Sequence, residues 1–280
     1  MRWFRFLLSH SIFASLCAVA LCYQTFVLLH IEHSIVLYAF VFFSTLSSYN
    51  FYWFLSKYSF GQKLGLKQFL RTNIVYVILF TTAGLGMLYC LFYLPYILTH
   101  VAVAIFLTLL YSMPLWPFAW AKYLRKAGLL KTILLASTWA YVTVIIPASS
   151  GMAAATAPVV SLWIARFFFV AMLCVIFDRR DIKLDEAHGV HSIATDLSKA
   201  TLNRLMLLAF LIYQAAGLLF RFYFSDHYQF IVFIITGLAV GWVYLLSLKP
   251  RGYFFYYFIV DGLMLFSALA TFIASLIAGR

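Results

Sequence analysis

The acidic side chains of this chain are concentrated in one short segment. Only eight Asp and Glu residues occur in 280 residues, and five of the eight lie between positions 178 and 196. Asp178, Asp181 and Asp185 have the spacing i, i+3 and i+7, which places three carboxylates on one face of a helix. Like charges on one face destabilise a helix, and hard cations such as Mg²⁺ prefer carboxylate oxygens and bridge to phosphates. The segment therefore predicts a Mg²⁺ site, and the alternative is a solvated loop whose mixed charges pair with one another.

Basic side chains accompany these carboxylates. Arg179, Arg180 and Lys183 lie on the other side of the same turns, where they could bind a diphosphate or lipid headgroups. Further basic residues could bind phosphate without a metal, namely Lys57, Lys63, Lys67, Arg71, Lys122, Arg125, Lys126 and Lys131.

The composition is that of a membrane protein. Hydrophobic residues make up 65% of the chain and charged residues 10%, whereas a soluble domain is about 45–50% apolar and about 25% charged. This excludes a soluble domain, a disordered chain and a disulfide scaffold. The net charge of +12 fits basic loops that follow the positive-inside rule better than it fits nucleic-acid binding.

Nine apolar segments are long enough to cross a bilayer, which requires about 20 residues each. They make up one all-α transmembrane domain over residues 1–280. The expected spans are 6–29, 34–56, 72–93, 97–116, 131–148, 157–177, 201–222, 228–248 and 253–277.

Basic residues indicate how these spans are oriented. With a cytoplasmic N-terminus, 17 of the 20 Lys and Arg residues fall on the inner side and two on the outer side. The C-terminus is then outside, and we expect a bacterial inner membrane. The longest polar loops are also cytoplasmic, so the function is expected on that face.

Two charges lie well inside the expected spans. Arg166 and Asp261 are costly in a membrane interior, where charged side chains are usually paired. The sequence favours a pair between them, and the alternative is a polar group at the bottom of a cavity.

Several of these features together resemble the UbiA family of intramembrane prenyltransferases. The nine expected helices resemble the family's topology. The Asp-x-x-Asp-x-x-x-Asp pattern at the end of the sixth helix is similar to the family's second aspartate motif. The segment from Gly189 to Ile193 resembles the family's following Gly-x-Lys/Arg-Thr-Leu tail, with His191 at the basic position. Tyr111-Ser112-Met113-Pro114 resembles its Tyr-Ser/Thr-x-Pro element.

The resemblance implies a ring of nine helices around a cytoplasm-facing cavity. Family members bind an isoprenyl diphosphate through Mg²⁺, release the diphosphate and transfer the allylic group to an aromatic or lipid acceptor. The resemblance also implies that the partners are membrane lipids and an isoprenoid. Nucleic acid is not expected as a partner. The residues expected to bind substrate are Asn50, Tyr111, Ser112, Lys122, Arg125, Lys131, Arg179, Lys183 and His191.

The chain departs from the family at the first aspartate motif, Asn-x-x-x-Asp-x-x-x-Asp. Asn50 matches its first position, but Phe54 and Tyr58 stand at the two aspartate positions, and no Asp or Glu occurs from 33 to 177. The spacing predicts that these three side chains face the cavity opposite Asp181 and Asp185. We therefore expect a single Mg²⁺ and slow or absent transfer. The alternative function is a non-catalytic protein that binds an isoprenoid lipid or a partner.

Overall fold

The computed structural model describes residues 2–60, 66–115, 128–151, 156–188, 191–224 and 226–279, and within these ranges the regular structure is helical. Nine helices of the described part are long and apolar enough to cross a membrane, which confirms the expected fold class. The membrane helices are α2 (Ile12–Leu29), α3 (Ile35–Phe60), α5 (Ile74–Phe92), α6 (Leu98–Ser112), α8 (Gly128–Ala140), α10 (Ala157–His188), α12 (Lys199–Phe224), α13 (His227–Ser247) and α14 (Asp261–Ile277).

Short elements extend or connect these helices. A π-helical turn, η3 (Tyr141–Ile145), and α9 (Ile146–Ala148) prolong α8, and a second π-helical turn, η4 (Phe255–Val260), precedes α14. The other short elements are α1 (Arg2–Ser9), α4 (Leu66–Thr72), η1 (Pro95–Ile97), η2 (Met113–Leu115) and α11 (Ile193–Asp196).

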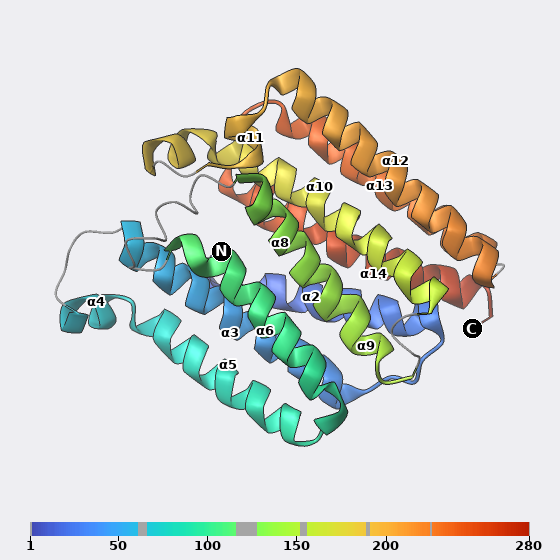
Figure 1. Ribbon diagram of the computed structural model, residues 1–280, viewed down its shortest axis with the longest axis horizontal. Helices are drawn as coiled ribbons and strands as arrows, with labels where there is room; N and C mark the ends of the chain where they lie inside the picture. The colour runs from blue at the N-terminus through green and yellow to red at the C-terminus, as the bar shows by residue number, and fades with distance from the viewer. Residues whose placement is uncertain are drawn as a thin grey trace.

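The helices form a closed ring. Going round it, α2 contacts α3 and α14, α14 contacts α13, and α13 contacts α12. The ring continues through α10 and α8 to α6. It closes at the two ends of α6, where η1 contacts α5 and η2 contacts α3, and α5 packs against α3. Figure 1 shows α3, α5 and α6 on one side of the molecule and α12 and α13 on the other, with α2, α8, α10 and α14 between them.

The first expected span begins later than the sequence suggests. The helix expected from residue 6 is broken at Ser11, whose φ of 60° lies in the left-handed region. The short helix α1 therefore precedes α2 as a separate element, and its Trp3 is 84% exposed. An apolar run predicts that a segment is buried in lipid, but it carries no signal for a single non-helical residue.

The sixth expected span continues far beyond its apolar part. Helix α10 has 32 residues, or roughly 48 Å at about 1.5 Å per residue, against a hydrocarbon core of about 30 Å. Its last turns carry Asp178, Asp181 and Asp185. The acidic segment is therefore helical, as the spacing of the aspartates predicts, and not a loop.

Candidate active site in a cavity with one charged end

The ring encloses a cavity of about 730 Å³ that is lined by α2, α3, α6, α8, α10 and the η4–α14 region. This volume falls within the range of about 300–1,000 Å³ that is usual for small-ligand sites. At one end the lining is apolar and includes Phe40, Val101 and Ile146. The charged lining residues, such as Lys57 and Lys131, lie at the other end, where α3 finishes and α8 begins. We call this the charged end.

The three aspartates of α10 all line the charged end. Asp178 is buried and accepts a hydrogen bond of 3.1 Å from the Thr132 hydroxyl on α8. Asp181 accepts two hydrogen bonds from the Arg180 guanidinium, at 2.7 and 2.8 Å. Asp185 is 9% exposed. Helix periodicity thus brings together the carboxylates that the sequence singled out.

Three cations face the same space. Lys131, one turn into α8, interacts electrostatically with the three aspartates. Arg180 lies over the rings of Tyr256 and Tyr257, with its guanidinium carbon 5.1 and 4.8 Å from their centres. The Lys57 ammonium of α3 lies 4.1 Å from the centre of the Tyr76 ring. The charged end therefore offers both carboxylates for a cation and fixed cations for an anion.

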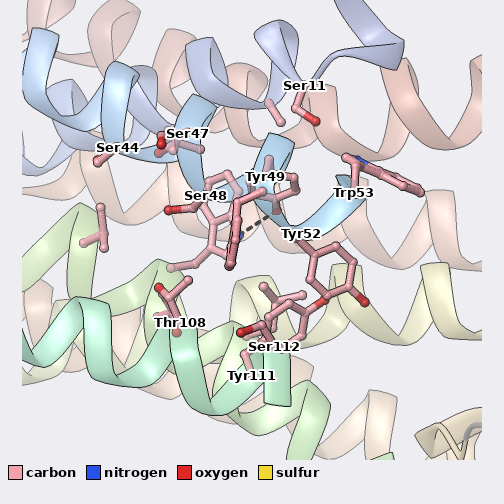
Figure 2. Close-up of a pocket in the computed structure, with 18 of the residues that line it drawn as sticks. Ser11, Ser44, Ser47, Ser48, Tyr49, Tyr52, Trp53, Thr108, Tyr111 and Ser112 are labelled. Atoms are coloured by element: carbon pink, nitrogen blue, oxygen red, sulfur yellow. Dashed lines mark hydrogen bonds between the residues drawn. The ribbon is translucent and has the colours of Figure 1, made fainter. Parts of the chain in front are cut away.

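Hydroxyl and aromatic groups cover the wall opposite α10. Figure 2 shows Ser44, Ser47, Ser48, Tyr49, Tyr52 and Trp53 on the α3 side and Thr108, Tyr111 and Ser112 on the α6 side. The rings of Tyr52 and Tyr111 are stacked, with centres 5.0 Å apart. The Trp139 indole N–H donates a hydrogen bond of 3.0 Å to the Tyr49 hydroxyl. Tyr111 and Ser112, which the sequence singled out, therefore lie in the cavity wall.

The predicted orientation of α3 is wrong. Asn50, Phe54 and Tyr58 are absent from the lining, and the cavity instead receives the face that carries Ser48, Tyr52 and Ser56. Asn50 is fully buried, and its amide donates hydrogen bonds to the Leu46 and His10 carbonyls, at 2.8 and 3.2 Å.

The physical reason lies at the break between α1 and α2. His10 precedes the left-handed Ser11, and its carbonyl is therefore available to the Asn50 amide, which anchors this face of α3 against the N-terminal segment. A match between the sequence and a family motif does not indicate the hydrogen bond between Asn50 and His10.

Several other predicted binding residues lie away from the lining. Arg179 donates a hydrogen bond of 3.3 Å to the Tyr244 hydroxyl, and Lys183 is exposed. His191 bonds to the Asp196 carboxylate at 2.6 Å. Lys122 and Arg125 lie outside the described residues.

The expected pair between Arg166 and Asp261 is not formed. Buried Arg166 donates a hydrogen bond of 3.4 Å to the Leu21 carbonyl, whereas Asp261 lines the cavity. The sequence placed Arg180 among the basic residues that could bind a diphosphate. In the structure Arg180 lines the cavity, on the helix face that also carries Phe177.

Asp178, Asp181 and Asp185 are the side chains that could hold the Mg²⁺ expected from the sequence. Among the described residues, no group of three or more His, Cys, Asp or Glu side chains is close enough to form a preformed metal centre. The three aspartates of α10 therefore do not form one preformed centre, and a hard divalent cation there would take one or two of their carboxylates and complete its shell with water and substrate oxygens. Helix α3 contains no Asp or Glu and cannot supply the carboxylates of a second ion.

In the part of the chain that the structure describes, fold and site define a helical membrane protein with a cavity that is charged at one end and apolar at the other. The structure of a UbiA homologue from Aeropyrum pernix K1 matches with a TM-score of 0.59 and 12% identity, over 98% of this chain and 99% of that one. The structure of a digeranylgeranylglyceryl phosphate synthase matches with a TM-score of 0.52 and 15% identity, over 96% of both chains. Family models and curated protein sequences give no match. The chain therefore has the UbiA fold.

Proposed function

We propose that this protein is a UbiA-type intramembrane prenyltransferase that binds an isoprenyl diphosphate with the diphosphate at the charged end. The observation that carries the proposal is the polarity of the cavity. Its charged end is lined by Asp178, Asp181, Asp185, Lys131 and Arg180, and its interior is apolar and aromatic. An isoprenyl diphosphate has the same distribution, with a polyanionic head and a hydrocarbon tail. The two similar solved structures, a UbiA homologue and a digeranylgeranylglyceryl phosphate synthase, have the same fold, and this supports assigning the chain to the UbiA-type class.

Mg²⁺ is part of the proposal. One ion held by Asp181 and Asp185 would supply Lewis-acid stabilisation of the leaving diphosphate. Lys131 and Arg180 stabilise the same developing charge as cations that the fold already places at this end of the cavity. The rings of Tyr49 and Tyr52 stabilise an allylic cation by about 0.5–2 kcal/mol. The apolar lining excludes the water that would quench that cation.

We place the charged end at the cytoplasmic face of the membrane. The expected inner side carries 17 of the 20 basic residues. Helices α4 and α11 lie at the same end of the bundle in Figure 1, and the C-terminus lies at the opposite end.

Transfer is expected to be slow because α3 lacks carboxylates. The test is turnover of farnesyl diphosphate by the purified protein in nanodiscs, with hydroxylated acceptors and with Mg²⁺ or EDTA. We expect Mg²⁺-dependent product formation below about 1 s⁻¹, the lower end of typical enzyme rates. Binding of the isoprenoid without any product would instead support the non-catalytic alternative.

A further inference from the structure

The cavity contains a fourth carboxylate, which the proposed diphosphate site does not use. Asp261 is the first residue of α14 and lines the cavity with Tyr257 and Tyr49. It lies six residues beyond Phe255, where its membrane span starts, or roughly 9 Å along the helix at about 1.5 Å per residue. A carboxylate thus lies within a membrane-spanning segment and faces the cavity instead of lipid.

Asp261 does not have the partner that a structural charge in a membrane usually has. Within the described ranges, its carboxylate makes no ion pair and accepts no hydrogen bond. Arg180 interacts with it electrostatically, but that guanidinium is already bound by Asp181. Intramembrane carboxylates are costly and mark functional positions. The cost at Asp261 is therefore not offset by a structural contact.

The backbone before Asp261 is adapted to present this side chain. The π-helical turn η4 ends there, and the Asp261 N–H bonds to the carbonyl of Tyr256, five residues earlier. Such a turn contains one residue more than an α-helical turn and shifts the faces that follow it. Tyr257 and Asp261 both line the cavity. π-helical turns are rare and occur frequently at functional sites.

Asp261 shares the cavity lining with the residues of the proposed diphosphate site and with aromatic residues. Arg180 binds Asp181 at the charged end and lies 4.8 Å from the centre of the Tyr257 ring, one helical turn before Asp261. Tyr49, whose hydroxyl accepts a hydrogen bond from the Trp139 indole N–H, lines the same cavity. The carboxylate therefore adjoins the region where the allylic end of a bound isoprenyl diphosphate would lie.

We propose that Asp261 binds the hydroxyl group of the second substrate and takes its proton. This inference rests on the proposed function. The acceptor oxygen forms a bond to the allylic carbon of the isoprenyl group, and the bond from that carbon to the diphosphate oxygen breaks. Its electron pair leaves with the diphosphate, and the acceptor proton moves to the Asp261 carboxylate. The step needs no oxidant or reductant.

The chemistry of the site selects the acceptor class. A carboxylate in an apolar environment accepts a hydrogen bond from a neutral hydroxyl, whereas it repels an anionic headgroup. Phenols and long-chain alcohols share this hydroxyl. An aromatic acceptor can also stack on the Tyr49 and Tyr52 wall, and an aliphatic alcohol cannot.

The test uses the full chain in nanodiscs and two hydroxyl probes, 4-hexylphenol and 1-decanol. Dicyclohexylcarbodiimide modifies carboxyl groups in apolar sites, and mass spectrometry reports the modification of Asp261. We expect labelling of Asp261 that a hydroxyl probe suppresses, and no such suppression at any site in Asp261→Asn. Suppression by 4-hexylphenol alone assigns a phenolic acceptor, and suppression by both probes assigns a general hydroxyl site.

Transfer from farnesyl diphosphate to the probe that protects Asp261 is the second readout. Asp261→Asn should lower transfer by about 100-fold or more, the usual contribution of general base catalysis. Binding of farnesyl diphosphate should remain unchanged, and Asp261→Glu should restore part of the rate. Asp226→Asn, which changes a carboxylate in the connection between α12 and α13, is the matched control and should transfer at the wild-type rate.

The two proposals fail in different ways. Labelling of Asp261 that neither probe suppresses overturns the acceptor site, and so does unchanged transfer in Asp261→Asn. A wild-type protein that does not bind farnesyl diphosphate overturns the proposed function, while probe protection still decides whether Asp261 binds a hydroxyl.

Discussion

At the scale of single residues, the site depends on how positive and negative groups share the charged end. Asp178 is bonded to Thr132 and Asp181 to Arg180, so these carboxylates already have partners on the protein. Lys131 faces the same carboxylates from α8. An incoming diphosphate would compete for these cations, and Mg²⁺ would compete for the carboxylates. The partners hold the side chains in place before either ligand arrives.

Lys131 is expected to be the main direct contact to the diphosphate. Replacing it in Lys131→Gln removes a charge-assisted hydrogen bond worth about 1.5–3 kcal/mol. Affinity for farnesyl diphosphate, measured by calorimetry, should therefore fall about 10- to 100-fold. Lys249→Gln removes the same charge away from the cavity and should bind like the wild type. Equal affinities in the two variants would show that Lys131 does not touch the diphosphate.

At the scale of elements, the orientation of α3 determines what the cavity can bind. Its cavity face carries Ser48, Tyr52 and Ser56, with hydroxyl groups at the spacing i, i+4 and i+8. Asn50 fixes this orientation through the His10 carbonyl.

Carboxylates on the cavity face of α3 should create a second metal site. Tyr52→Asp with Ser56→Asp places two carboxylates opposite α10, so it should raise Mg²⁺-dependent turnover of farnesyl diphosphate at least about 10-fold. Phe54→Asp with Tyr58→Asp adds the same two carboxylates to α3 on a face that does not line the cavity, and it is the matched control. A rise in the control variant, with none in the first, would show that the orientation of α3 described here is wrong.

The start of α8 is held by close packing against α11. A Cβ at Gly128 would lie 2.6–2.7 Å from backbone atoms of Ser192, the N-cap residue of α11. Because Lys131 and Thr132 follow within about one turn, this contact positions both side chains at the charged end.

Gly128→Ala should therefore destabilise the protein and weaken diphosphate binding together. Overpacking of this kind costs about 1–3 kcal/mol, and thermal unfolding in detergent should show a lower midpoint. Gly241→Ala is the control, because a Cβ at Gly241 meets nothing within 4 Å and Ala is a better helix former. A midpoint for Gly128→Ala at or above that of Gly241→Ala would contradict the packing argument.

At the scale of the whole molecule, hydropathy was sufficient to predict the nine spans, because each is an apolar helical segment of 18 residues or more, close to the length that a bilayer requires. The ring was implied by the resemblance to the UbiA family and not by hydropathy. Hydropathy did not predict the break at Ser11 or the π-helical turn before Asp261, because it carries no signal for the backbone conformation of single residues. The common face of Asp178, Asp181 and Asp185 could be predicted from the sequence, because helical spacing alone puts them on one side of a helix. Asn50 was assigned to the wrong environment, because spacing places residues on a common face without showing what that face contacts.

The central claim is that the charged end of the cavity binds the diphosphate of an isoprenyl diphosphate. The most direct test is calorimetric binding of farnesyl diphosphate and of farnesol to the protein in nanodiscs, with Mg²⁺ and with EDTA. The wild type should bind the diphosphate more tightly than the alcohol, and only the diphosphate should respond to Mg²⁺. Asp181→Asn with Asp185→Asn should abolish that response and leave farnesol binding unchanged. Equal affinities for the two ligands in the wild type, or an undiminished Mg²⁺ response in the double variant, would contradict the account.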